Sequence, residues 1–313
     1  MTMHLITVDT ECSSHPGALG VTGQIGREEV GVRKLAEVFR AHGLRATFFV
    51  DVYEAQEPRA RLLREACRDL QAAGHDLELH THPTSGGART NGQMARHGFD
   101  EQVAILRQGQ ALFREWFGQE PVAHRAGDWA ANADTLRALR AVGIPVDSSL
   151  FFGWPACALR DGLRPSNRPR MLDGVLEVPP TVFYSPGFGV CAPHRLLTTD
   201  GHSYGELRSV LRQLARGTAA VAVSVFHSFS LLEWNRRRTR YWVARRKLEA
   251  FERLIEDIAR TGQGRTFREL HARYQEDPAS IAGGREELPR SAARFFVPRL
   301  LDRGRLALRR MAR

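Results

Sequence analysis

Lysine is almost missing from this sequence of 313 residues. Of its 45 basic residues, only Lys34 and Lys247 are lysine. We interpret this bias as the mark of a GC-rich genome rather than of a guanidinium-specific function. The net charge is +10, but residues 285–313 hold nine arginines against three acidic residues and leave only +4 for the rest of the chain. Because no basic stripe with interleaved aromatic residues stands out in that main part, nucleic acid is not an expected partner.

Cysteine is scarce as well. The four cysteines, Cys12, Cys67, Cys157 and Cys191, are far apart, and none forms a Cys-x-x-Cys pair. This spacing does not favour a disulfide framework or a zinc ribbon, and reduced thiols are typical of a cytoplasmic protein. Cys12 lies beside a candidate site described below, but we interpret it as a bystander.

Long apolar runs are also missing. The sequence has no window of about 18 apolar residues that would form a transmembrane helix. Its first residues, MTMHLITVDTE, run directly into a strand pattern without the basic start and apolar stretch of a signal peptide. We therefore expect a cytoplasmic protein, either free or peripheral on the inner face of the membrane. No Gly-x-Gly-x-x-Gly follows a predicted strand, so the sequence does not favour a dinucleotide site.

The chain does contain a regular alternation of short apolar runs and amphipathic stretches. With 42% hydrophobic and 26% charged residues, it can form a sizeable core. The alternation predicts βα units around a parallel sheet. We expect a distorted (β/α)7 barrel over residues 1–275, with a doubly wound open sheet as the alternative. The clearest predicted strands are 4–9, 45–50, 75–82 and 219–227, and the clearest helices are 28–43, 58–74, 98–118 and 241–262.

Some stretches depart from this rhythm. Residues 151–174 have no period and are predicted to form a loop, and 174–183 is predicted to be a strand interrupted by prolines, at a sheet edge or a barrel gap. Residues 276–313 form a basic tail. In 290–313 arginines alternate with apolar residues, which predicts either a frayed tail or an amphipathic helix on an anionic membrane surface. The RRRTRYWVARRK run (236–247) would add to that surface or bind a phosphorylated substrate.

Polar residues at the carboxyl ends of predicted strands are the candidates for chemistry in such a fold. Asp9 ends the first strand and Glu11 follows two residues later, and alternate residues of an extended chain face the same way. Two carboxylates on one side repel each other unless a cation or a proton lies between them. The alternative is a solvated turn with a capping aspartate.

A second candidate set lies in LELHTH, where Glu78, His80 and His82 share one face of a predicted strand and two leucines share the other. Two imidazoles at this spacing can bind one metal ion at about 2.0–2.1 Å. Histidine together with a carboxylate suits Zn²⁺, and also Co, Ni or Fe. The alternative, a pair of ordinary histidines, is weakened by Pro83 and the Gly/Ser/Thr loop that follow.

Later strand ends carry further candidates. Arg125 in HRAGDW is placed to pair with the aspartate of the first strand and aim it. In the same loop, Asp128 is either functional or a loop cap, and Trp129 either stacks on a sugar ring or belongs to the core. His227 ends the most apolar strand, AVAVSVF; a lone histidine there is often a core residue, but this one lies at the strand end. Asp147 in VDSSL is a candidate to orient a histidine or raise its pKa.

Taken in their order along the chain, these motifs resemble those of the polysaccharide deacetylase family, whose catalytic domain is the NodB-homology domain. The resemblance covers about residues 4–275. Each motif alone has low specificity, whereas their joint order is highly specific. The chain is similar to the divergent branch of the family that is found with surface-glycan biosynthesis. The matching motifs are TVDTE (7–11), ATFFV (46–50), AGHDLELHTHP (73–83), HRAGDW (124–129), GIPVDSS (143–149) and FHSF (226–229).

The resemblance implies a distorted barrel and a metal-dependent hydrolase that removes N-acetyl groups from an amino sugar or glycan. The divalent metal would be Zn²⁺, with Co, Ni or Fe as alternatives. The expected partner is an N-acetylated sugar or glycan, lipid-linked or nucleotide-linked. The roles that the resemblance implies are metal binding by Glu11, His80 and His82, proton abstraction from water by Asp9, orientation of Asp9 by Arg125, and proton donation to the leaving amine by His227.

The chain departs from the family pattern in its first, second and fourth motifs. Thr10 replaces the second aspartate, with a glutamate one place later, and the two histidines are closer together than the usual His-Thr-x-x-His. Leu150 and Phe151 replace the Asp-Trp of the fourth motif, which leaves Asp147 as the candidate to tune the late histidine. Two other hypotheses stay open: a metal-independent amide or ureide hydrolase on the same barrel, and a non-catalytic glycan-binding module.

Overall fold

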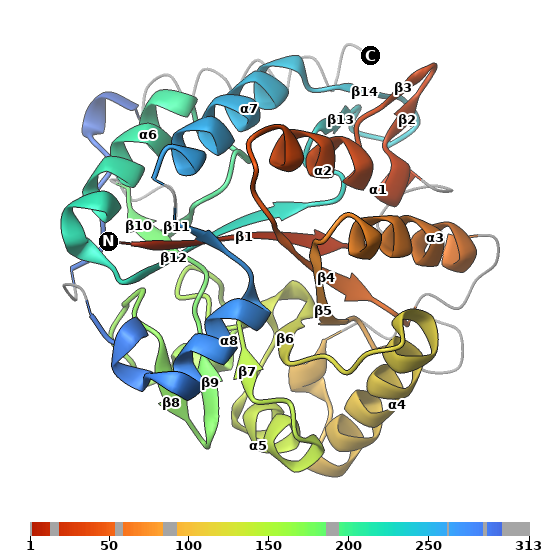
Figure 1. Ribbon diagram of the computed structural model, residues 1–313, viewed down its shortest axis with the longest axis vertical. Coiled ribbons are helices and arrows are strands. Elements are labelled where there is room, and N and C mark those ends of the chain that lie inside the picture. The colour runs from red at the N-terminus through yellow and green to blue at the C-terminus, as the bar shows by residue number, and fades with distance from the viewer. Residues whose placement is uncertain are drawn as a thin grey trace.

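The computed structural model describes residues 2–12, 19–53, 59–83, 93–185, 194–261, 263–283 and 287–295. Its centre is a curled sheet of nine strands in the order β12-β1-β4-β5-β6-β7-β9-β8, with β15 beside β1 (Figure 1). Neighbouring strands are parallel except β8, which runs antiparallel to β9. The strands are β1 Met3–Thr10, β4 Thr47–Asp51, β5 Asp76–Thr81, β6 Ala123–Ala126, β7 Val146–Asp147, β8 Arg170–Leu172, β9 Val175–Glu177, β12 Val221–His227 and β15 Gly264–Arg265.

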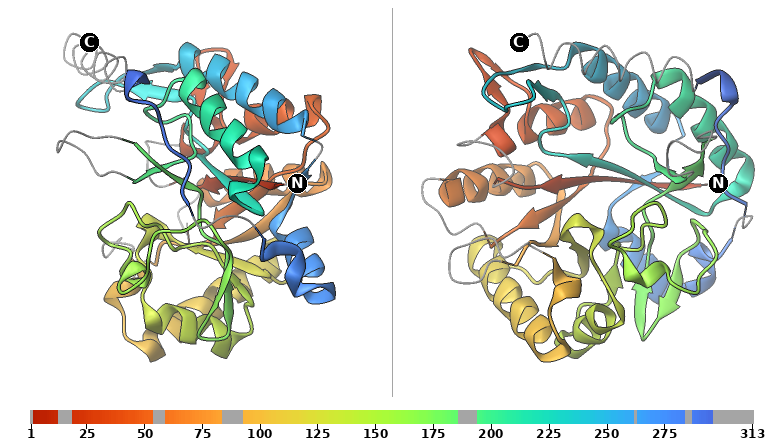
Figure 2. Two further views of the ribbon diagram at one scale, coloured as in Figure 1. Left: turned by 90° about the vertical axis from the view of Figure 1, so that its left-hand side faces the viewer. Right: turned by 180° about the vertical axis from the view of Figure 1, so that it is seen from behind.

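Helices surround the sheet and cover its outer face (Figure 2). Because α2, α3, α4 and α5 each connect one parallel strand to the next, the chain forms the βα units that the alternating pattern predicted. The predicted α/β class and distorted barrel are therefore confirmed. The helices are α1 Leu19–Thr22, α2 Val32–Ala41, α3 Arg59–Ala72, α4 Phe99–Phe117, α5 Ala133–Val142, α6 Tyr204–Gln213, α7 Arg245–Ala259 and α8 Phe267–Glu276, with single turns at Met94–Arg96, Gly127–Trp129, Ala158–Arg160, Leu214–Thr218, Pro278–Ile281 and Ala293–Phe295.

Local sequence sets the ends of the longest helix, α4. The backbone N–H of Gly98 donates to the Glu101 side chain at 3.0 Å, which satisfies a donor at the helix start. The helix stops at Gly118, whose φ is 67°. Only glycine adopts this left-handed conformation without steric cost, so the helix ends where the sequence predicted.

The barrel is irregular where prolines interrupt the chain between β9 and β12. The segment predicted as one strand over 174–183 divides into β9 and β10 (Val182–Tyr184), and β10 pairs with β11 (His194–Leu196). Between them the backbone N–H of Thr181 donates to the Val223 carbonyl at 3.0 Å. Pro179 and Pro180 have no N–H to contribute to a ladder, which explains the break.

Two short hairpins differ from the sequence-based expectation. Residues 241–243, predicted as the start of a long helix, form strand β14 (Tyr241–Val243), which pairs with β13 (Leu232–Trp234). Helix α7 therefore begins only at Arg245. The cross-strand pairing of aromatic residues stabilises this hairpin and overrides the helical pattern. A second hairpin, β2 (Gln24–Ile25) with β3 (Glu28–Glu29), follows β1, and β8 lies within the segment 151–174 that was predicted as a loop.

The segment after residue 275 packs against the barrel up to Phe295. Arg290 forms a parallel bridge with Tyr184, and the hydroxyl of Ser291 donates to the buried carboxylate of Glu206. The amphipathic helix predicted within 290–313 falls almost entirely on residues 296–313, outside the described residues.

The described part of the chain contains no helix that is long and apolar enough to cross a membrane. Its cysteines, Cys12, Cys67 and Cys157, are buried thiols that form no disulfide. Cys191 lies outside the described residues.

Candidate active site

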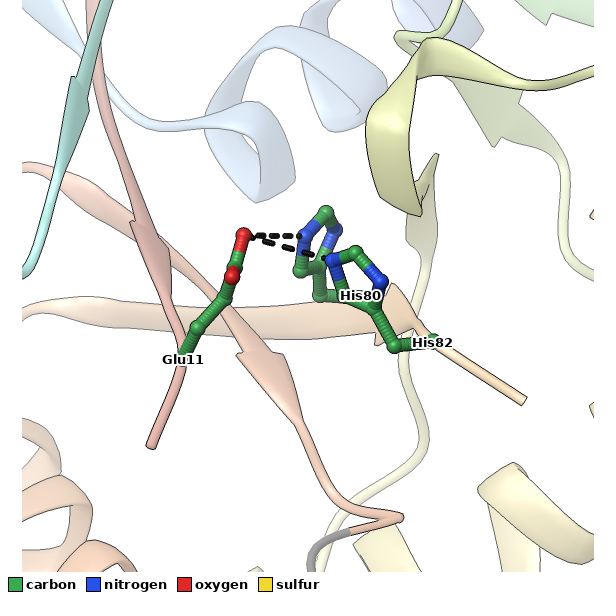
Figure 3. A group of neighbouring side chains, drawn as sticks. All are labelled: Glu11, His80 and His82. Carbon is green, nitrogen blue, oxygen red and sulfur yellow. Dashed lines mark hydrogen bonds and ion pairs between the residues drawn. The ribbon is translucent and has the colours of Figure 1, made fainter. Parts of the chain in front are cut away.

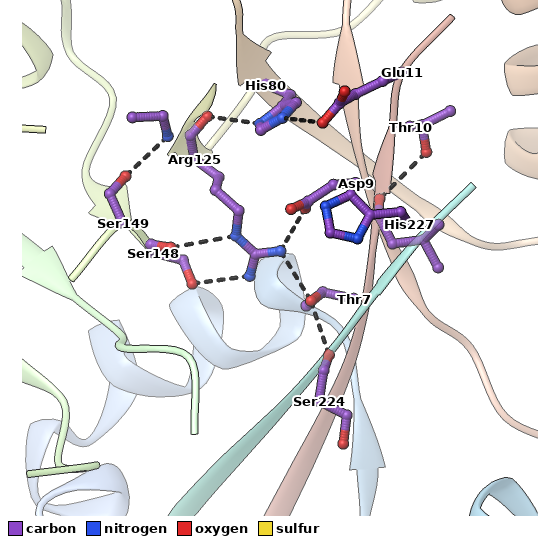
Figure 4. Close-up of polar contacts among 12 residues, drawn as sticks. Thr7, Asp9, Thr10, Glu11, His80, Arg125, Ser148, Ser149, Ser224 and His227 are labelled. Atoms are coloured by element: carbon purple, nitrogen blue, oxygen red, sulfur yellow. Dashed lines mark hydrogen bonds and ion pairs between the residues drawn. The ribbon is translucent and has the colours of Figure 1, made fainter. Parts of the chain in front are cut away.

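The candidate residues gather at one edge of the curled sheet. Asp9, His80, Arg125 and His227 lie at the carboxyl ends of β1, β5, β6 and β12 (Figure 4). Glu11 comes just after β1, as His82 comes just after β5. Because these strands are parallel, their carboxyl ends meet on the same side of the barrel, where βα barrels carry their active sites.

An ion pair between Arg125 and Asp9 forms the centre of this group. Arg125 Nη1 donates to Asp9 Oδ1 at 2.6 Å and to the Thr7 hydroxyl at 2.9 Å. Arg125 Nη2 donates to the Ser148 hydroxyl at 3.0 Å. Arg125 is the largest fully buried side chain among the described residues, and a planar guanidinium held by several partners has little freedom to rotate. The pair therefore aims Asp9 in a fixed direction.

Aromatic rings enclose the guanidinium. Its Cζ lies 4.1 Å from the ring centroid of Phe49 and 5.1 Å from that of Trp129. Trp129 is only 8% exposed and packs edge-on against Phe151, so its ring supports Arg125 and belongs to the core. Asp128 is exposed and accepts a hydrogen bond from the Gln93 amide.

A candidate metal centre lies beside this pair. Glu11 Oε1 is 3.3 Å from His80 Nε2 and 3.3 Å from His82 Nε2 (Figure 3). All three side chains are buried. Donor atoms about 2.0–2.1 Å from a tetrahedral ion lie about 3.3–3.4 Å from one another, so these distances suit Zn²⁺. The close spacing of the histidines therefore still brings both imidazoles to the same carboxylate oxygen.

Backbone contacts orient the two imidazoles. His80 Nδ1 lies 2.9 Å from the backbone oxygen of Arg125; because a carbonyl only accepts, Nδ1 carries a proton, and Nε2 faces Glu11. His82 packs on Gly127, where a Cβ atom would lie 2.4 Å from His82 Cε1. Glycine is therefore required at this position for the observed ring placement.

The electrostatics of the cluster favour an ionised glutamate. Burial alone would raise the pKa of Glu11, but the charge of His82 and hydrogen bonds from His80 and His82 hold it well below its usual range. A carboxylate and two imidazoles are a donor set that suits Zn²⁺, Co, Ni or Fe, and three protein ligands leave a coordination position open for water or substrate.

His227 has partners that the sequence did not predict. It pairs in register with Asp9, and its ring stacks on Phe229 with centroids 5.0 Å apart. Its backbone N–H donates to the Ser230 hydroxyl at 2.9 Å, and that hydroxyl donates to Asp200 Oδ2 at 3.2 Å. Asp200 and Ser230 therefore form a polar shell behind His227, which no motif pointed to.

The Asp200 carboxylate is also bound by one of the two lysines of the chain. Lys247 Nζ donates to Asp200 Oδ1 at 2.7 Å. Burial would raise the pKa of Asp200, but Lys247, through charge and hydrogen bond, and then the charge of His227 lower it below its usual value. Asp200 is therefore an anion that interacts electrostatically with the His227 ring.

Asp147 does not contact His227, which corrects the expectation that it tunes the late histidine. Asp147 Oδ1 is 2.8 Å from His124 Nδ1, and His124 Nε2 is 2.7 Å from the Thr81 hydroxyl. His124 precedes Arg125 in β6 and so points to the opposite face of the sheet. Asp147 thus orients a histidine behind the candidate site.

Glu78, on the same strand face as His80 and His82, lies at the other end of that strand. Its Oε2 accepts hydrogen bonds from the backbone N–H groups of Val122 and Ala123, and its Oε1 accepts from Arg268 Nη2 at 3.0 Å. Glu78 therefore ties β5, β6 and α8 together and does not join the metal centre.

The site thus combines a carboxylate–arginine pair with a Glu/His/His cluster at one edge of the barrel sheet. Comparison with known families agrees: residues 22–146 match the family model described as Polysaccharide deacetylase. The resemblance to the polysaccharide deacetylase family is thereby confirmed, and it supports a hydrolase of the deacetylase type. No curated protein matches the chain.

Solved structures share the fold. A Mycobacterium smegmatis protein assigned as a polysaccharide deacetylase has a TM-score of 0.55 at 18% identity, and 93% of each chain is covered. The Puue allantoinase has a TM-score of 0.59 at 12% identity, with 88% of this chain and 90% of that chain covered. At these identities the likeness concerns the fold.

Proposed function

We propose that the protein is a metal-dependent N-deacetylase of an amino sugar or glycan, with a free amine and acetate as products. The observation that carries this proposal is the single oxygen, Glu11 Oε1, that lies 3.3 Å from both His80 Nε2 and His82 Nε2, next to the Arg125–Asp9 pair. A metal-ligand set and an oriented carboxylate at the strand ends of one sheet are groups that can catalyse amide hydrolysis by water.

Glu11, His80 and His82 would hold the divalent ion, most simply Zn²⁺. When bound, the ion supplies Lewis-acid polarisation of the amide carbonyl and makes water more acidic. The buried side chains keep bulk water from the donors, because Glu11 is 7% exposed and His80 only 2%.

The other residues would move the protons. Asp9, aimed by Arg125, accepts the proton of the attacking water. His227 lies on the neighbouring strand at the register position of Asp9 and donates a proton to the leaving amine. Because Asp9 and His227 lie on two paired strands, the distance between the base and the acid stays constant through the reaction. This fixed distance is the main contribution of the barrel to catalysis.

The proposed substrate is an N-acetylated sugar within surface polysaccharide or lipopolysaccharide biosynthesis, lipid-linked or nucleotide-linked. The supporting observations are the family match and the basic residues of the chain end. A cytoplasmic enzyme that is peripheral on the inner face of the membrane would meet such a substrate.

A metal-independent amide or ureide hydrolase is the second candidate, and the fold likeness to an allantoinase favours it. A non-catalytic glycan-binding module is the third. A binding module does not require a buried Arg125–Asp9 pair. Because burying two charges costs free energy, the pair argues for a role beyond stability, which counts against this third candidate.

The test is acetate release from N-acetylglucosamine oligomers, together with metal analysis of the purified protein. We expect Asp9→Asn and His227→Ala to abolish release, whereas the exposed controls Asp100→Asn and His42→Ala retain it. We expect His80→Ala and His82→Ala to lose bound metal. Unchanged release in the first pair would contradict the mechanism. Full metal content in both histidine variants would contradict the metal-ligand assignment. Activity without metal would favour the metal-independent hydrolase.

A further inference from the structure

We propose that the tip of the β13–β14 hairpin, residues 235–240, is a binding site for a phosphate or diphosphate group of the substrate. This inference rests on the proposed function, because it places an anionic substituent of the glycan beside the deacetylation site. It is carried by the charge of the tip, by its rigid loop, and by a line of aromatic rings that connects it with His227.

The tip concentrates positive charge. Arg236, Arg237, Arg238 and Arg240 are exposed. Among the described residues, no carboxylate forms an ion pair with Arg236, Arg237 or Arg240. Guanidinium groups bind phosphate oxygens through paired N–H donors, so a cluster of this kind favours a phosphate over a neutral sugar.

The acidic side chains near the hairpin are bound elsewhere. Glu233 Oε2 accepts from the Trp242 indole N–H at 2.9 Å. Glu28, on the adjacent β2–β3 hairpin, accepts from Arg245 Nη1 at 2.6 Å. Both acids therefore make their contacts at the base of the hairpin. The tip, residues 235–240, contains four arginines and no acidic residue, so its net charge is positive.

Asn235 holds the loop in one conformation. Its buried side chain accepts from the backbone N–H of Thr239 at 2.8 Å and of Arg240 at 3.2 Å, and its amide donates to the Thr239 hydroxyl at 2.9 Å. Arg238 has a φ of 55°, a left-handed conformation in which arginine is uncommon. The loop thus keeps an arginine where glycine or asparagine would be less strained, and it presents the guanidinium groups on a fixed backbone.

The tip is connected with the candidate site through side-chain contacts. The His227 and Phe229 rings stack with centroids 5.0 Å apart, and Phe229 and Trp234 lie 6.4 Å apart. Arg238 Cζ lies 5.3 Å from the Trp234 ring centroid. The line of contacts leads from the proposed proton donor to the charged tip, so one extended substrate can reach both.

The hairpin also stands at the correct end of the barrel. Figure 1 shows β13 and β14 beside β2 and β3, the hairpin that follows the carboxyl end of β1. Because His227 precedes β13 by only five residues, the hairpin rises directly from the strand end that carries it. A sugar at the deacetylation site would therefore lie against aromatic rings and extend its anionic group to the arginines.

The experiment titrates sodium pyrophosphate into the full-length protein by isothermal calorimetry. The tip variant is Arg236→Gln/Arg237→Gln/Arg240→Gln. The control, Arg107→Gln/Arg212→Gln/Arg216→Gln, removes the same charge from exposed arginines elsewhere. We expect the tip variant to bind pyrophosphate about 10-fold more weakly or worse, with a reduced salt dependence, and the control to match the wild type. Equal affinity in both variants would overturn the inference.

Kinetics and vesicle binding complete the test. For N-acetylglucosamine 1-phosphate we expect a higher KM with kcat retained in the tip variant, and no change for diacetylchitobiose. If only flotation with phosphatidylglycerol vesicles depends on the tip arginines, the surface contacts membrane lipid and the substrate site is wrong. If the wild type releases no acetate from any N-acetyl sugar, the proposed function fails, while the pyrophosphate titration still decides on the site.

Discussion

Arg125 Nη1 donates to Asp9 Oδ1 across 2.6 Å, and both side chains are buried. The two residues are far apart in the sequence and lie on strands β6 and β1, which are separated in the sheet by β4 and β5. Their contact therefore crosses the interior of the curled sheet. The same curvature brings Glu11 of the β1 end to His80 and His82 of the β5 end.

Replacement of Arg125 tests the first of these contacts. Arg125→Gln leaves Asp9 as a buried charge without its cation, so we expect the free energy of unfolding to fall by about 3–5 kcal/mol. We expect acetate release to fall about 100-fold, because Asp9 loses its orientation. Arg125→Lys should recover part of the stability but little activity, since lysine cannot bind Asp9, Thr7 and Ser148 together.

Denaturant unfolding and initial rates measure these effects. The control is Arg33→Gln, which removes an exposed arginine paired with Asp69 and should change the unfolding free energy by less than about 1 kcal/mol. A glutamine variant at position 125 as stable and active as the wild type would show that the pair neither supports the fold nor aims Asp9.

Gly127→Ala tests the metal centre without replacing a proposed ligand. Its Cβ would lie 2.4 Å from His82 Cε1 and 2.6 Å from His82 Nε2, so the ring must move. We expect zinc affinity to fall by roughly 10–100-fold, as for other changes that displace a ligand, with the protein still folded. Competition with a chromophoric chelator gives the affinity and circular dichroism the fold. Gly98→Ala, whose nearest neighbour is 3.9 Å away, is the control. Unaltered zinc affinity in Gly127→Ala would exclude His82 as a ligand.

The pH dependence of the reaction tests the shell behind His227. Asp200→Asn removes an anion that stabilises a protonated His227 and frees the charge of Lys247. We expect the alkaline limb of the kcat profile to shift to lower pH by about 0.5–1 unit. Lys247→Met removes the cation that offsets the charge of Asp200. The alkaline limb of the kcat profile of this variant should therefore move to higher pH. The opposite directions form an internal control, because a merely structural role would not reverse the sign. Two shifts of the same sign would exclude electrostatic tuning by Asp200.

We expect the fold to lose stability at acidic pH because the side chain of His4 is buried. Burial lowers the pKa of His4 from 6.5 to about 4. Between these two values the unfolded chain binds one proton more than the folded chain, so stability is lost as the pH falls below about 6.5, by about 1.4 kcal/mol per pH unit. His75, whose pKa burial also lowers to about 4, acts in the same direction.

We expect His4→Leu to remove the His4 part of this slope, and the exposed-site variant His42→Leu to leave it unchanged. Urea unfolding at several pH values between 7 and 5 measures the slope. A wild-type slope that His4→Leu leaves intact would show that other groups account for the acid sensitivity.

Sequence reasoning reached the strands and the residues at their ends, but it missed the β13–β14 hairpin and the Asp200–Ser230 shell. The hairpin was missed because 241–243 continue the apolar spacing of α7, and only pairing between Trp234 and Tyr241 makes them a strand. Asp200 was missed because it belongs to a loop that approaches His227 only in the folded chain.

The sequence by itself determined the βα alternation, the strand ends that carry Asp9, His80, Arg125 and His227, and the resemblance to a deacetylase family. The alternation and the strand ends depend on local periodicity, which a chain displays before it folds. The resemblance depends on the order of the motifs along the chain. Only the tertiary structure decided which groups meet. Neighbouring residues of a strand point to opposite faces, so Asp147 contacts His124 and not His227. The curvature of the sheet brings Glu11 to two histidines on a strand that it does not pair with.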